Sequence, residues 1–243
     1  MINFTKWIEL YGDLYEINPA EENFYCNLCD EFPQHAKALN VEAGLALLPS
    51  KLAYKYDVTV TDSFHEFVQN IGTRQVQTET QPPMFHMDSS ELTKYLGKNF
   101  FNVVFCVNSR VIFLKEAAVI EKLISDSKDL LSDGGYLVFD LINFDKYDLS
   151  QPSITLPVRN VGNTSLKTTI TNKDNVFEIN QTISKDNGEP VYVVEKEKIY
   201  PIGCKEFKTI AEKLGFSSVE FYSDYNKTPY TKDAYKVIAV LKK

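Results

Sequence analysis

The sequence is poor in the residues that build metal centres. Its 243 residues include only three histidines, His35, His65 and His86, which are isolated and lack the spacing of metal ligands. The four cysteines are too few and too scattered for a disulfide framework, so we expect free thiols. Cys26 and Cys29 form a C-x-x-C pair, but no second Cys or His pair follows at zinc spacing, which favours simple packing within a helix. We therefore expect no metal site.

Long hydrophobic runs are also missing. No apolar run approaches the roughly 20 residues that span a bilayer. The first residues, MINFTKWIEL, lack the basic start and apolar core of a signal peptide. The net charge of -7 argues against a nucleic acid bound over a broad face. We expect a cytoplasmic protein that acts on a small molecule and has neither a membrane nor a nucleic-acid partner.

Several short functional motifs are absent as well. There is no G-x-G-x-x-G dinucleotide loop, no Walker A phosphate loop and no G-x-S-x-G nucleophile elbow. The remaining composition is that of an ordinary globular protein, with 24% charged and 44% hydrophobic residues. The chain is long enough for one large α/β domain with an insertion.

The stretch from Lys37 to Asp62 predicts a βαβ unit. Ala38 to Val41 is a short apolar run typical of a buried strand, and leucines recur at helical spacing from Leu47 to Leu52. Val58 to Thr61 is β-branched and is followed by an acid, Asp62. A right-handed crossover places the first turn and the end of the second strand at one carboxyl edge of the sheet, where ligands of open α/β folds bind.

Further strands and helices follow along the chain. The apolar strand FFNVVFCVNS precedes an amphipathic helix from Glu116 to Leu131, and a turn at Asp133-Gly134-Gly135 leads into a fifth strand from Tyr136 to Ile142. Other expected elements are a strand over 84–87, a helix over 205–214 and closing strands over 217–222 and 235–241. Together they predict an α/β fold with a Rossmann-like, seven-stranded, mostly parallel sheet and helices on both faces.

Residues 154–200 have a different pattern. β-branched residues alternate with polar ones and are interrupted by turn signals such as Asp186-Asn187-Gly188, which is typical of antiparallel strands with one wet face. We expect residues 151–200 to form an antiparallel β insertion and residues 1–34 an N-terminal helical lid. Residues 35–150 and 201–243 would form the α/β domain.

The spacing from the first turn to Asp62 resembles that of class I S-adenosylmethionine-dependent methyltransferases. Their first motif reads acid-x-Gly-x-Gly-x-Gly, in which the glycines let the backbone approach the cofactor. Aligned with this chain, the motif falls on Asn40, Glu42, Gly44 and Ala46, so one glycine of three is kept. The helix, Leu-Leu-x-x-Gly-Gly turn and apolar strand further on are similar to the second half of the family's fold. The resemblance implies that Asn40, Glu42 and Gly44 lie at the methionine end of S-adenosyl-L-methionine.

The same resemblance implies cofactor contacts at two more strand ends. Asp62, followed by Ser63, takes the position of the acid that binds the ribose hydroxyls. Asp88 or the next residue, Ser89, takes the position that meets the adenine amino group. An acid followed by serines is also a favoured helix N-cap, which is the alternative interpretation of Asp88.

Two further regions are implicated by the resemblance. Cys106 and Asn108 would lie beside the transferred methyl group, although Asn108 is equally well explained as a turn residue. Tyr11 and Tyr15 resemble the tyrosines of an N-terminal segment that closes over the cofactor in several small-molecule methyltransferases. A core-facing aromatic stripe would give the same spacing.

The resemblance implies a methyltransferase that acts on a nitrogen or oxygen atom of a small molecule. Methyl transfer from a sulfonium mainly requires alignment of acceptor, methyl and sulfur, so no catalytic residue is assigned. His86 could act as a base near Asp88, but a strand histidine is more often simply packed. The alternative is a methyltransferase-like binding or interaction protein that has lost catalysis and keeps a vestigial cofactor site. The β insertion would contribute to the acceptor cavity or to a homodimer contact.

Overall fold

Two units make up the chain in the computed structural model. It describes residues 1–15, 17–71, 81–186 and 188–243, without the side chains of residues 11–13, 70 and 71. The smaller unit consists of Met1–Glu16 and Tyr147–Pro201, and the larger unit of Ile17–Lys146 and Ile202–Lys243.

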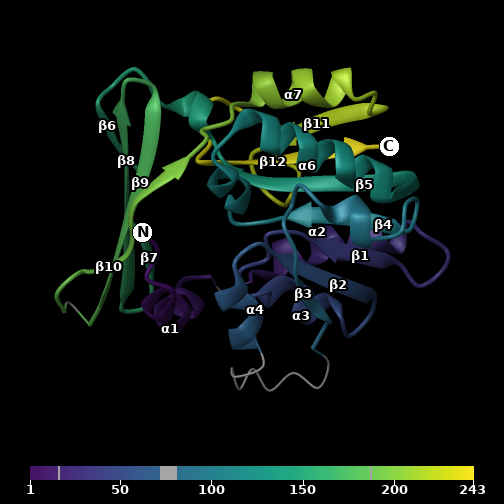
Figure 1. Ribbon diagram of the computed structural model, residues 1–243, viewed down its shortest axis with the longest axis horizontal. Coiled ribbons are helices and arrows are strands. Elements are labelled where there is room, and N and C mark those ends of the chain that lie inside the picture. Colours follow the sequence, from purple (N-terminus) through teal and green to yellow (C-terminus); the bar gives the residue numbers. More distant parts are fainter. Residues whose placement is uncertain (16, 72–80, 187) are drawn as a thin grey trace. The chain divides into compact units, whose positions relative to one another are not determined.

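The larger unit is built on a seven-stranded sheet in the order β11-β12-β5-β4-β1-β2-β3 (Figure 1). Its strands are β1 (Lys37–Asn40), β2 (Asp57–Asp62), β3 (Met84–His86), β4 (Phe101–Cys106), β5 (Leu131–Ile142), β11 (Ser218–Tyr222) and β12 (Lys236–Lys242). β12 pairs antiparallel with β5 and β11, and the other pairs are parallel. The predicted seven-stranded, mostly parallel sheet is confirmed.

Helices cover both faces of this sheet. They are α2 (Pro19–Asp30), α3 (Leu47–Leu52), α4 (His65–Ile71), α5 (Leu92–Tyr95), α6 (Ala117–Leu130) and α7 (Cys204–Lys213), with short 3-10 helices at Arg110–Leu114 and Phe144–Lys146. Val138 of β5 belongs to the buried cluster that includes Leu28 of α2 and Leu52 of α3. The next residue, Phe139, points to the other face, where its ring lies 5.0 Å from that of Phe207 in α7.

The predicted turn at Asp133-Gly134-Gly135 is wrong in detail, because these residues lie inside β5. The pairing of β5 with β4 shifts register between Phe101 and Val103, so β5 carries extra residues there. Gly134 has φ +72, a left-handed conformation that glycine adopts without a steric penalty. The two glycines therefore serve a bulge within the strand.

The smaller unit contains the predicted antiparallel insertion. Its strands are β6 (Ser153–Thr155), β7 (Arg159–Val161), β8 (Thr164–Lys173), β9 (Val176–Lys185) and β10 (Val191–Ile199), in the order β10-β9-β8-β6 with β7 also on β8. Asn187 of the predicted turn lies outside the described residues. The helix α1 (Phe4–Leu14) belongs to this unit, and Ile2 forms an antiparallel bridge with Val194 of β10. The first 34 residues, expected to form one lid, are thus divided between the units.

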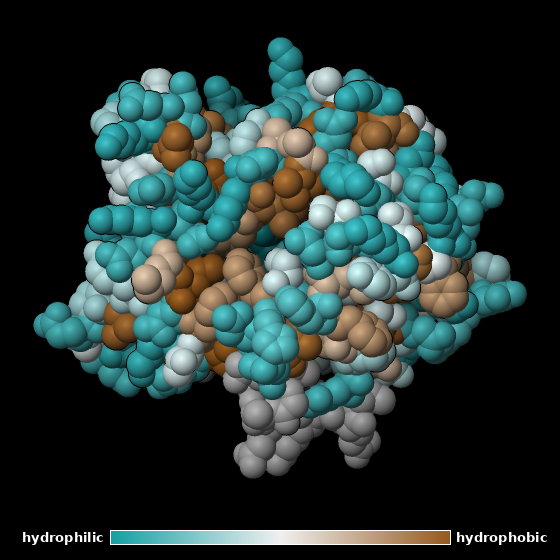
Figure 2. All heavy atoms as spheres, in the orientation of Figure 1, coloured by the Kyte–Doolittle hydropathy of each residue, from teal (hydrophilic) through white to brown (hydrophobic). Residues whose placement is uncertain are grey.

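Hydrophilic side chains make up most of the face drawn in Figure 2, with hydrophobic side chains in smaller groups between them. Within the described residues, every helix is too short or too polar to cross a bilayer.

Candidate functional site

Two buried acidic residues lie next to each other at the carboxyl edge of the larger sheet. Asn40 of β1 pairs with Val60 of β2, so Glu42 and Asp62, each two residues further along, reach the edge side by side. The exposed fraction of Glu42 is 1% and that of Asp62 is 0%. Burial of a carboxylate is costly unless hydrogen bonds and positive charge compensate it. The site must therefore supply both.

The turn after β1 has the left-handed backbone of a glycine-rich loop, although it contains only one glycine. Glu42, Gly44 and Ala46 have φ values of 50°, 59° and 51°. These are the three positions at which the first motif of the resembled family carries glycine. A left-handed conformation costs a non-glycine residue roughly 1–2 kcal/mol. The surrounding contacts of Glu42 and Ala46 must offset that cost.

The Asp62 carboxylate holds this turn against the start of the segment that follows β2. Its Oδ2 accepts a hydrogen bond from the Gly44 N–H at 2.7 Å, and its Oδ1 accepts one from the Phe64 N–H at 2.7 Å. Arg110 Nη2 lies further away, 3.3 Å from Oδ2 and 3.5 Å from Oδ1. Backbone donors therefore make the short bonds to Asp62, and the guanidinium makes the longer ones.

Glu42 is bound by two serine hydroxyls. Ser63 Oγ donates to its Oε2 at 2.9 Å, and Ser89 Oγ donates to its Oε1. Arg110 Nη2 lies 3.9 Å from Oε2. Burial, and then the negative charge of Asp62, raise the pKa of Glu42 to about 7 despite Arg110 and the serines. The cluster holds two acids for one cation, which explains why one of the acids retains its proton more strongly.

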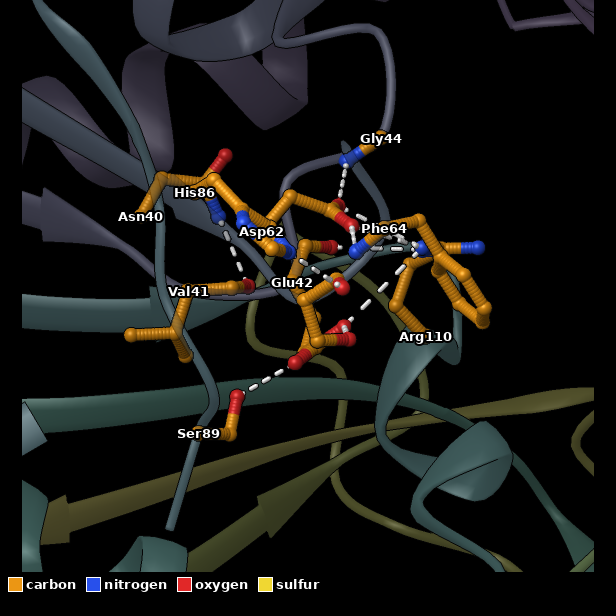
Figure 3. A network of polar contacts seen from close by, with 10 residues as sticks. Asn40, Val41, Glu42, Gly44, Asp62, Phe64, His86, Ser89 and Arg110 are labelled. Carbon is orange, nitrogen blue, oxygen red and sulfur yellow. Dashed lines mark hydrogen bonds and ion pairs between the residues drawn. The ribbon is translucent and has the colours of Figure 1, made fainter. Parts of the chain in front are cut away.

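Arg110 completes the cluster (Figure 3). Its exposed fraction is 3%. Its Nε donates to the Glu42 carbonyl at 3.3 Å. Its guanidinium carbon lies 4.8 to 5.5 Å from the centres of three phenylalanine rings, those of Phe67, Phe64 and Phe113. Such contacts stabilise a desolvated cation. Arg110 therefore contacts both aromatic rings and buried carboxylates.

Asn40 is buried beneath the turn. Its side-chain Nδ2 donates to the carbonyls of Phe105 at 3.0 Å and Val41 at 3.3 Å, which ties β1 to β4. Its Oδ1 has no hydrogen-bond partner among the described residues. Asn40 thus has a clear structural role in the strand pair.

Asp88 and Ser89, which follow β3, have different surroundings. Ser89 is buried against Glu42, whereas Asp88 is exposed and its Oδ1 accepts hydrogen bonds from Ser90 N at 2.8 Å and Ser90 Oγ at 2.6 Å. These bonds lower the pKa of Asp88. The alternative interpretation of Asp88 as a helix N-cap is wrong, because the N-cap of α5 is Glu91. Asp88 instead forms a local turn with Ser90.

A cavity of about 610 Å³ lies at this strand end, lined in part by Ser63, His86, Asp88 and Tyr95. His86 is exposed, and its Nε2 lies 3.1 Å from the Ser63 carbonyl. The cavity opens beside the buried cluster, since Ser63 lines the cavity and also binds Glu42. A small molecule bound there would meet carboxylate, hydroxyl and aromatic groups.

Among the described residues, neither Cys106 at the end of β4 nor Asn108 forms a hydrogen bond with Glu42 or Asp62. Cys106 is buried, and burial raises the pKa of its thiol well above the usual range. Asn108 and Ser109 both have left-handed backbones, with φ values of 57° and 56°. Asn108 is therefore a turn residue, and this turn directs Arg110 toward the acids.

Tyr11 and Tyr15 belong to the smaller unit, so their predicted closure over the cofactor stays a prediction. The side chain of Tyr11 lies outside the described residues. The ring of Tyr15 lies 4.2 Å from the guanidinium carbon of Arg159.

The structure brings together five of the residues singled out in the sequence, which are Glu42, Gly44, Asp62, Ser63 and Ser89. Sequence reasoning missed Arg110. A signal was present, because Arg110 is a single charge ahead of the apolar run Val-Ile-Phe-Leu. A charge in such a setting needs a buried partner.

Comparisons with known proteins support one fold. No protein-family model and no curated protein matches the chain. Among solved structures, the chain is similar to an S-adenosylmethionine-dependent methyltransferase from Clostridium acetobutylicum, with 14% identity over 98% of each chain and a TM-score of 0.78. It is also similar to CalS10 of Micromonospora echinaspora, an amino pentose methyltransferase with S-adenosylmethionine bound, with 14% identity over 96% of this chain and 94% of that one and a TM-score of 0.69.

The sugar N-methyltransferase KedS8 from Streptoalloteichus is a further neighbour, with 14% identity over 93% of this chain and 87% of that one and a TM-score of 0.64. The similarity covers at least 93% of the present chain in each case, although only 14% of the residues are identical. The chain has the fold of class I S-adenosylmethionine-dependent methyltransferases.

Proposed function

We propose that the chain is an S-adenosylmethionine-dependent methyltransferase that acts on a nitrogen or oxygen atom of a small molecule. The observation that carries the proposal is the turn at Glu42, Gly44 and Ala46, which has left-handed backbone at each motif position and is fixed to Asp62 through the Gly44 N–H. A left-handed backbone at Glu42 and Ala46 costs stability, so its presence is expected where the turn serves a function. Neighbours of the same fold act on small molecules, including amino sugars.

The residues at this edge supply the groups that the cofactor needs. Asp62 would accept from the ribose hydroxyls, Glu42 would pair with the ammonium of the methionine end, and the cavity beside Asp88 would take the adenine. One feature opposes binding, because Arg110 lies on Asp62 where the ribose would be. These carboxylate acceptors therefore fit the cofactor once the Arg110 guanidinium has moved.

The bound cofactor would supply an electrophilic methyl group on its sulfonium. The chain would contribute alignment and exclusion of water, since an amine or hydroxyl acceptor needs only to be oriented and deprotonated. The ionised carboxylate of Glu42 would stabilise the positive charge at the methionine end of the cofactor. The proposal leaves the acceptor's base unassigned.

A second function is favoured by the burial of the cluster itself. Glu42, Asp62 and Arg110 form a buried cluster of opposite charges, as expected for a methyltransferase-like protein that serves as a binding or interaction module. The two functions differ in whether the chain binds S-adenosylmethionine.

Replacing Asp62 with Ala tests the proposed function. We expect affinity for S-adenosylhomocysteine to fall by roughly 1.5 to 3 kcal/mol, because a charged acceptor of two hydroxyls is lost. Isothermal titration calorimetry on the wild type and on Asp62→Ala measures this change. Circular dichroism would establish that the variant is folded.

Asp57→Ala is the matched control, since Asp57 begins the same strand at its opposite end and its side chain is 64% exposed. Its affinity should equal that of the wild type. Equal dissociation constants for Asp62→Ala and the wild type would contradict the ribose assignment, and absence of wild-type binding would favour the second function.

A further inference from the structure

Arg110 lies beside the glycine turn. Gly44 has φ +59, and a Cβ built at this position would lie 3.7 Å from Arg110 Nε and 3.9 Å from its Cδ. Glycine at a turn of this kind allows a partner to approach the backbone closely. At these ordinary van der Waals distances the Arg110 side chain borders the turn and still leaves room for a Cβ.

The contacts of Arg110 with the two buried acids are long. Its Nη2 contacts with Asp62 are 3.3 and 3.5 Å long, and that with Glu42 is 3.9 Å. Charge-assisted hydrogen bonds between a guanidinium and a carboxylate are typically about 2.7–2.9 Å long. The backbone bonds to Asp62, at 2.7 Å, are shorter and do not depend on Arg110. Removal of the guanidinium would therefore leave the Asp62 carboxylate in position.

A ribose and Arg110 cannot both use Asp62. The carboxylate is fully buried and already accepts two backbone hydrogen bonds, so the remaining acceptor positions are those that Arg110 faces. The same positions would have to receive the vicinal hydroxyls of a nucleoside.

We propose that Arg110 is an internal competitor for the nucleoside part of the cofactor and thereby sets the affinity of the site. The inference rests on the proposed function. Nucleosides bind the fraction of molecules in which the guanidinium has left Asp62, so the apparent dissociation constant is raised by the inverse of that fraction. If Arg110 lies on Asp62 in about nine molecules of ten, affinity is reduced roughly tenfold.

Arg110→Met is the direct test, because methionine keeps the apolar contacts to the phenylalanine rings and lacks the guanidinium. Calorimetric titrations with adenosine and with S-adenosylhomocysteine should give dissociation constants about tenfold lower than those of the wild type for both ligands. A merely structural role of Arg110 would predict weaker binding, since the loss of a structural contact loosens the site.

Arg110→Met alone leaves two buried acids without their cation and could fail to fold. The double variant Arg110→Met with Glu42→Gln avoids this, because the second substitution removes the charge of one acid. Adenosine lacks the methionine end, so it should also bind this variant more tightly than the wild type. Lys98→Met is the control for loss of a positive charge, since Lys98 pairs with Asp129 at the exposed surface.

The results separate the inference from the function on which it rests. Unchanged or weaker nucleoside binding in folded Arg110→Met, with measurable binding in the wild type, would overturn the inference and leave the proposed function standing. Absence of binding of both ligands to every variant would overturn the proposed function and the inference with it.

Discussion

At the scale of single residues, Glu42 is where this site departs from an ordinary glycine turn. It combines a left-handed backbone, almost complete burial and a pKa raised to about 7. The cause of the raised pKa is removal from water, followed by repulsion from Asp62. A group whose folded pKa exceeds its unfolded value by this mechanism destabilises the fold once it is ionised.

The exchange Glu42→Gln tests this account through the pH dependence of stability. The unfolded pKa is 4.5 and the folded pKa about 7, so the folded state binds more protons between these values. The free energy of unfolding should therefore fall as pH rises from about 4.5 to 7 and then level off. Since each pKa unit corresponds to about 1.4 kcal/mol, we expect Glu42→Gln to be more stable than the wild type by about 3 kcal/mol at pH 8.

Urea denaturation at pH 5 and pH 8 measures the effect, with Glu121→Gln as the control because Glu121 forms a surface ion pair with Lys213. The gain of Glu42→Gln should shrink towards pH 5. A gain that is the same at both pH values would contradict the raised pKa.

The sequence allowed some of these residues to be placed and not others. Gly44 follows β1 and Asp62 ends β2, and the apolar patterns of both strands fix where they end. Their meeting at the carboxyl edge could therefore be predicted. Arg110 lies 48 residues beyond Asp62, and its direction depends on the left-handed turn at Asn108 and Ser109. Neither asparagine nor serine requires that conformation, so local pattern alone could not reveal the contact.

At the scale of elements, β5 shows where strand patterns stop being informative. Its apolar residues predict the strand and its buried faces, whereas the shift in its pairing with β4 depends on close packing of two backbones. Gly135 lies in this bulge. A Cβ at Gly135 would lie 2.9 Å from the carbonyl oxygens of Asn102 and Ser132, and neither backbone atom can move aside easily.

Gly135→Ala should therefore destabilise the protein by about 1–3 kcal/mol through overpacking. Thermal and urea unfolding of the variant would measure the loss. Gly97→Ala serves as the control, because its Cβ would meet Phe100 at an ordinary 3.6 Å, and it should change stability by less than about 0.5 kcal/mol. A Gly135→Ala variant as stable as Gly97→Ala would show that the bulge can open to accept a side chain.

At the scale of the whole molecule, periodicity predicted both sheets, because strands buried on both faces and strands with one wet face have distinct patterns. The division of the first 34 residues could not be predicted in the same way. The chain before α1 joins the smaller sheet through backbone bonds, with Asn3 N donating to the Val193 carbonyl at 2.9 Å. Backbone pairing of this kind leaves little trace in side-chain pattern. Association of two copies through β6–β10 stays a prediction.

The most direct test of the proposed function is a crystal structure of the protein grown with S-adenosylhomocysteine. We expect the nucleoside at the ends of β2 and β3, its ribose hydroxyls on the Asp62 carboxylate and the Arg110 guanidinium displaced from Asp62. A structure at saturating ligand in which Arg110 still lies on Asp62 and the edge holds no nucleoside would contradict the assignment of this edge as a cofactor site.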